Sequence, residues 1–76
     1  MARDNSRDTR RREERLNLLE GRIHAQENTL RKAIHDLQQA GEKGAYEKIH
    51  QLSWQVSQAQ AGLDELMAEW EKLAVA

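Results

Sequence analysis

The chain has 76 residues, 33% of them charged, with a formal net charge of −1 and no cysteine. This length allows one small domain at most, and the missing cysteine excludes a disulfide staple and cysteine-based zinc sites. A mean hydropathy of −0.95 is unlike a membrane span or a secretory signal, and the four glycines form no phosphate-binding loop. The composition predicts a cytoplasmic helical protein with no membrane partner, no cofactor and no walled catalytic pocket.

Charge is distributed unevenly along the chain. The first 15 residues carry six arginines and four carboxylates, a formal charge of +2, whereas residues 16–76 carry six basic and nine acidic side chains, a formal charge of −3. We therefore expect a basic head, residues 1–15, on an acidic body. The start of the first helix has several candidate caps but no complete capping box. We predict that residues 1–8 are flexible and that the helix begins at residue 9.

From Leu16, apolar side chains recur at alternating steps of three and four, which predicts a coiled-coil helix over residues 9–40. The seam positions, a and d of the heptad, are Leu16, Leu19, Ile23, Gln26, Leu30, Ala33, Leu37 and Ala40. Gln26 is the one polar residue among them. A loop is expected at residues 41–44, where Gly41 or Gly44 supplies the left-handed residue that ends the helix.

The same spacing resumes and predicts a second helix over residues 45–74. Its seam positions are Ala45, Ile49, Leu52, Val56, Ala59, Leu63, Leu66, Trp70 and Leu73. A short loop can only turn the second helix back along the first, so the predicted fold class is all-α, an antiparallel two-helix coiled-coil hairpin. Pairing residues whose numbers sum to 85 or 86 places Leu16 by Trp70 and Gln26 by Ala59.

This register also places opposite charges together at the flanking g positions. It brings Asp36 towards Lys48 and Arg15 towards Glu69. Exposed pairs of this kind contribute only ~0.2–1 kcal/mol each, so they indicate register rather than stability. A two-helix seam gives only a small apolar core, and the chain has no disulfide to stabilise it. We therefore expect either self-association into a homodimer or four-helix bundle, or burial against a larger parent protein.

No residue pattern predicts catalysis or metal binding. His24, His35 and His50 fall at outer heptad positions. His24 has Glu27 and Asn28 at suitable helical spacing for a metal site, but no second histidine joins it on that face. The carboxylates lie on solvated flanks, where nothing would raise a pKa for acid–base chemistry. The sequence therefore predicts neither catalytic residues nor metal ligands.

Trp54 falls at an outer f position, pointing away from the first helix. Because aromatic residues are enriched at interaction hot spots, we predict Trp54 as a partner contact, with shielding by neighbouring side chains as the alternative. Ile34, Tyr46 and Met67 at e positions widen the apolar stripe, which favours packing against a further helix.

The basic head is the candidate nucleic-acid site. Arginine pairs bidentately with phosphate, and clustered arginines gain affinity from counterion release. The candidate contacts are Arg7, Arg10, Arg11, Arg12 and Arg15, with Lys43 and Lys48 at the hairpin tip as secondary contacts. Interleaved carboxylates weaken the field, and the head has no aromatic residue to stack on bases. The alternative is a solvated linker.

Two sequence motifs carry a family resemblance. Residues 40–46 read AGEKGAY at the turn, and residues 66–73 read LMAEWEKL near the end of the second helix. With the arginine-rich lead-in, they make the chain similar to the C-terminal hairpin domain of ABC-F proteins, the duplicated ATP-binding cassette ATPases without membrane spans. The turn and Trp70 carry most of the discrimination, since any antiparallel coiled coil shares the leucines.

The resemblance implies a parent ATPase that associates with the ribosome or with DNA, in which this hairpin adds nucleic-acid affinity. It implies a turn-packing role for Tyr46, a seam role for Trp70, and a basic lead-in that tethers the hairpin to the second ATPase cassette. The Walker and signature motifs of ATP hydrolysis are absent from the sequence. The chain is therefore either a non-catalytic domain excised from an ATPase, which we expect, or a stand-alone relative.

These observations leave three function hypotheses. The first is an accessory hairpin of an ABC-F ATPase that contacts phosphates of DNA or ribosomal RNA without base readout. The second is a protein-interaction or dimerisation module with no nucleic-acid role. The third is a tRNA-contacting coiled-coil arm like those of some aminoacyl-tRNA synthetases. The first predicts an affinity that falls steeply with salt, and the second a mass that rises with concentration.

Overall fold

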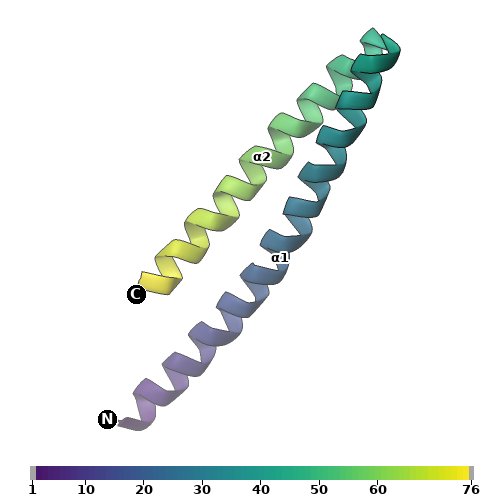
Figure 1. The fold of residues 1–76 in the computed structure, drawn as a ribbon. Coiled ribbons are helices and arrows are strands. Elements are labelled where there is room, and N and C mark those ends of the chain that lie inside the picture. Colours follow the sequence, from purple (N-terminus) through teal and green to yellow (C-terminus); the bar gives the residue numbers. More distant parts are fainter. Residues whose placement is uncertain (1, 76) are drawn as a thin grey trace.

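The computed structural model describes the backbone of residues 2–75 and the side chains of residues 7–75 (Figure 1). Two helices, α1 (Ala2–Lys43) and α2 (Tyr46–Val75), lie antiparallel and pack along their length into a rod of 64 × 14 × 13 Å. Its length is that of α1, since 42 residues rise about 63 Å at 1.5 Å each. The predicted all-α antiparallel hairpin is confirmed.

The packing between the helices follows the heptad seam. Every predicted seam side chain is buried or half-buried. The most buried are Leu19, Ala33, Ala40, Ala59 and Leu63. Arg12 is also half-buried, because it lies one heptad step before Leu16 and the register places it level with Leu73. The seam therefore continues one step further into the basic head than the apolar residues indicate.

The core of the hairpin is thin. None of the side chains that the structure describes is less than 2% exposed, because two helices enclose only one seam and leave both of its flanks open. Large apolar side chains outside the seam are exposed, among them Leu18 and Met67. The hairpin therefore relies on this one seam for its apolar packing.

Gln26 is held by a hydrogen bond across the seam. Its Nε2 donates to the backbone carbonyl of Ala59 at 2.9 Å. Gly62 leaves the space for this contact, since a Cβ there would lie 2.9 Å from the same nitrogen. The predicted pairing of Gln26 with Ala59 is confirmed, and with it the register in which paired residue numbers sum to 85.

The turn is a Schellman helix end at Gly44. This residue has a φ of +68°, its N–H donates to the carbonyl of Gly41 at 3.2 Å, and the Ala45 N–H donates to the carbonyl of Ala40 at 3.0 Å. These are the two bonds that define the motif, with glycine in the left-handed position. Gly41 itself remains within α1, so Gly44 is the residue that ends the helix.

The helix ends differ from the predicted ones. Helix α1 covers Ala2–Lys43 rather than residues 9–40, the turn is shorter than residues 41–44, and α2 covers Tyr46–Val75 rather than residues 45–74. The head contains no glycine or proline, and arginine and glutamate favour helix, so α1 runs through it. The flexibility of residues 1–8 stays a prediction, and Met1 and the side chains of residues 2–6 lie outside the described residues.

We expect alanine at Gly21 and at Gly62 to have different effects. Gly21 has open space around it, so Gly21→Ala should raise the free energy of unfolding by up to about 1 kcal/mol through helix propensity. Gly62→Ala should be less stabilising or even destabilising, because Gln26 must move and give up a hydrogen bond worth about 1 kcal/mol. Urea unfolding measures both. Equal gains would contradict the role of Gly62, whereas in a Gln26→Ala background both substitutions should stabilise.

A second pair of variants tests the turn. Gly44→Ala should lower the free energy of unfolding by about 1–2 kcal/mol, because the left-handed backbone strains any Cβ. Gly41→Ala should be neutral or stabilising, since Gly41 is helical and nothing lies within 4 Å of a Cβ placed there. Thermal unfolding followed by circular dichroism compares them, and a stable Gly44→Ala variant would show that the turn adopts another conformation.

Candidate nucleic-acid interface

Part of the basic head extends past the end of α2, and the rest lies beside the last turns of α2. In the observed register Val75, the last residue of α2, is level with residue 10. Residues 2–9 therefore project beyond α2 by about 12 Å. Figure 1 shows this free end of α1 passing the C-terminus.

Three arginines of the head lie on the face of α1 that points away from α2. Arg7, Arg10 and Arg11 occupy positions f, b and c of the heptad, and all three are exposed. Glu14 shares that face at position f. Arg12 differs from them, because it is half-buried at the seam. The structure therefore brings together three of the five predicted head contacts on one open surface.

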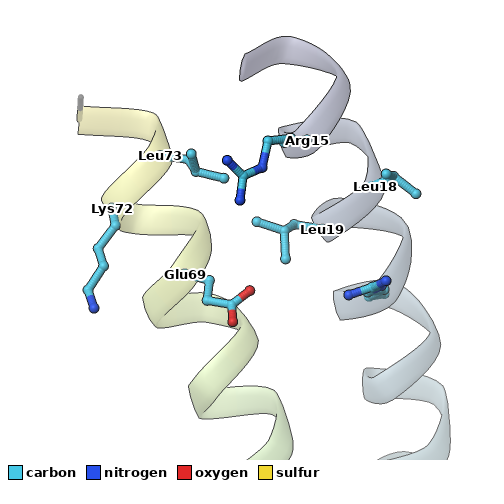
Figure 2. A pocket seen from close by; sticks show the side chains of 7 residues that line it. Arg15, Leu18, Leu19, Glu69, Lys72 and Leu73 are labelled. Atoms are coloured by element: carbon cyan, nitrogen blue, oxygen red, sulfur yellow. The ribbon is translucent and has the colours of Figure 1, made fainter. Parts of the chain in front are cut away.

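Arg15 turns towards the space between the helices instead. Together with Glu69 and Leu73 of α2, it lines a groove at the open end of the hairpin (Figure 2). Figure 2 shows its guanidinium between the two ribbons, with the Glu69 carboxylate directed into the same space from α2. Arg15 and Glu69 therefore line the same groove, as the register predicts.

Lys43 and Lys48 lie at the opposite end of the rod. Both are exposed, and together with Asp36 they line a groove at the hairpin tip. The 28 residues that separate Arg15 from Lys43 along α1 span about 42 Å. The head and the tip therefore do not form one cluster.

Trp54 is 65% exposed on α2, as its f position predicts. Its indole also borders a groove between the helices, which the f position alone does not predict. That groove includes Lys32 of α1 and has the buried Ala33 and Ala59 in its lining. The register could have indicated this groove, because small residues at Ala33 and Ala59 leave room beside the seam.

Trp70 is half-buried in the seam, and its Nε1 donates to Glu20 Oε1 at 3.2 Å. The heptad spacing predicts the seam position of Trp70 but not this hydrogen bond to Glu20. Glu20 lies at position e, one turn after Leu16, which the register pairs with Trp70. A search for acceptors beside each seam tryptophan would have found it.

The described part of the chain contains neither a group of metal ligands nor a membrane-spanning helix. Its His, Asp and Glu residues include no group of three that could hold a metal ion. None of its helices is both long enough and apolar enough to cross a membrane.

No family model, curated protein or solved structure matches the chain.

Proposed function

We propose that the hairpin is a non-catalytic module that binds DNA or structured RNA through phosphate contacts. The observation that supports this most directly is the exposure of Arg7, Arg10 and Arg11 on the outer face of α1, close to or beyond the end of α2. Guanidinium groups there can pair with phosphates without any movement of the hairpin. The head has no aromatic residue to stack on a base, and contacts to phosphates carry no sequence information, so this proposal involves no base readout.

The elongated shape makes this binding compatible with the acidic body. The rod is 64 Å long, whereas the Debye length is about 8 Å at physiological salt. Carboxylates several turns away from the head are therefore screened from a polyanion bound at it. A duplex approaching the free end of α1 experiences mainly the local charge of the head.

We also propose that the hairpin belongs to an ABC-F ATPase, with ATP hydrolysis carried out by other domains. Residues 40–46 contain the helix end at Gly44, and residues 66–73 contain the seam residue Trp70. The turn-packing role that the resemblance implies for Tyr46 is not seen, since Tyr46 is 78% exposed. In such a parent protein the basic head would be both a nucleic-acid contact and the connection to the second cassette.

Neutralising the head should weaken binding and reduce its salt dependence. For Arg7→Gln with Arg11→Gln, we expect the slope of log affinity against log salt on duplex DNA to fall by about 0.9 for each phosphate that the variant no longer neutralises. Arg31→Gln is the matched control, because Arg31 is an exposed α1 arginine outside the head that donates to Asn28 Oδ1 at 3.2 Å. Fluorescence anisotropy at several salt concentrations measures the slopes. Equal slopes for all variants, or no binding at low salt, would contradict the proposal.

A second candidate function is self-association, supported by exposed apolar side chains outside the seam. Trp54, Met67 and Ile34 are 65%, 47% and 39% exposed. If they pack against a second copy, the mass measured by light scattering should rise with concentration, and Trp54→Ala should return it to that of a monomer. A monomeric wild-type chain at all concentrations would remove this candidate.

A further inference from the structure

Three grooves follow one another along a single side of the hairpin, from its open end to its tip. Their lining residues occupy heptad positions c, d and g of both helices, with Trp54 at position f as the exception. In an antiparallel pair the g positions of the two helices flank the same side of the seam. The second and third grooves share Asp36, so they are continuous. We call this surface the groove side.

The groove side is basic, although the chain as a whole is acidic. Its six cations are Arg15, Arg22, Lys32, Lys43, Lys48 and Lys72, and its two carboxylates are Asp36 and Glu69. The lining residues of the three grooves therefore carry a formal charge of +4 in a chain of net charge −1. Glu65, at position c between the first and second grooves, lowers the charge of the whole side to +3. These cations are spread over all three grooves, from Arg15 in the first to Lys48 in the third.

An exposed aromatic ring stands midway along this surface. Trp54 borders the second groove opposite α1, where Ala33 and Ala59 leave the space open. Its other neighbours are polar, among them Lys32, His50 and Gln55. A tryptophan at a protein–protein hot spot usually sits in a well-packed pocket surrounded by contacts that exclude water. With Lys32 across the groove and Lys48 nearer the tip on the same helix, the surroundings of the ring favour a polyanion with a π-face instead.

We propose that the groove side binds a single-stranded stretch of nucleic acid, with one unpaired base stacked on Trp54 and the flanking phosphates contacted by Lys32 and Lys48. This inference rests on the proposed function and deepens it by naming the strand state. Stacking on an aromatic side chain needs a base whose face is free, which a duplex does not offer. The rod, 14 × 13 Å in cross-section, is also wider than a major groove of about 12 Å.

The first test is the effect of Trp54 variants on binding of a fluorescent single-stranded oligonucleotide and of the same sequence as a duplex. The wild-type chain should bind the single strand more tightly. Trp54→Leu should weaken single-strand binding about 5- to 150-fold and leave duplex binding unchanged. Trp54→Phe keeps an aromatic ring and should retain most of the single-strand affinity. Because Trp54 is exposed, these variants keep the seam intact, which circular dichroism checks.

Two adjacent residues on opposite sides of the hairpin provide a matched control for charge. Lys32 lies on the groove side and Arg31 at position b on the other side. Lys32→Gln should lower the single-strand salt slope by about 0.7, and Arg31→Gln should not change it. In a Trp70→Phe background, Trp54 is the remaining tryptophan of the two, and its fluorescence should be quenched by the single strand.

The outcomes separate this inference from the proposed function. If Trp54→Leu binds the single strand as well as the wild type does, while Arg7→Gln with Arg11→Gln binds more weakly, the groove inference is overturned and the head remains the binding site. If Trp54→Leu abolishes self-association without changing oligonucleotide affinity, Trp54 is a protein contact and the inference is again overturned. If the wild type binds no nucleic acid at low salt, the proposed function fails as well.

Discussion

A single line of contact between α1 and α2 has to hold the whole hairpin together. Because only two helices share it, each seam side chain keeps an open flank, and small residues at Ala33, Ala40 and Ala59 let the backbones approach. The same small residues open the grooves beside the seam. The small seam residues therefore have two effects. They bring the helices together, and they leave the grooves that Trp54 and the cations line.

The heptad spacing was sufficient to predict the fold class, the seam and the register, because hydrophobic period is a strong and cumulative signal. Helix ends were predicted less well, since they depend on local competition. In the sequence, Gly41 and Gly44 are equally good candidates for the left-handed residue that ends α1. The backbone conformation distinguishes them, because the positive φ is at Gly44. The head offers several candidate caps but no helix breaker, and α1 begins at Ala2 rather than at the predicted residue 9.

The candidate site was predictable as a set of residues but not as a surface. Arg7, Arg10 and Arg11 share one face, whereas Arg12 is half-buried in the seam and Arg15 lines a groove. These differences follow from heptad position, yet charge clustering in the sequence gives all five arginines equal weight. Side-chain direction also mattered for Trp54 and for Glu20, whose contacts depend on rotamers that a linear pattern does not specify.

The position of the turn has a consequence for the order in which the hairpin opens. Near Gly44 the paired residues are close in sequence, as Ala40 and Ala45 are, whereas Glu20 and Trp70 are separated by 50 residues. Closing a long loop costs more chain entropy than closing a short one. The seam should therefore zip from the tip and fray from the open end, so that amide protons exchange fastest where the basic head lies.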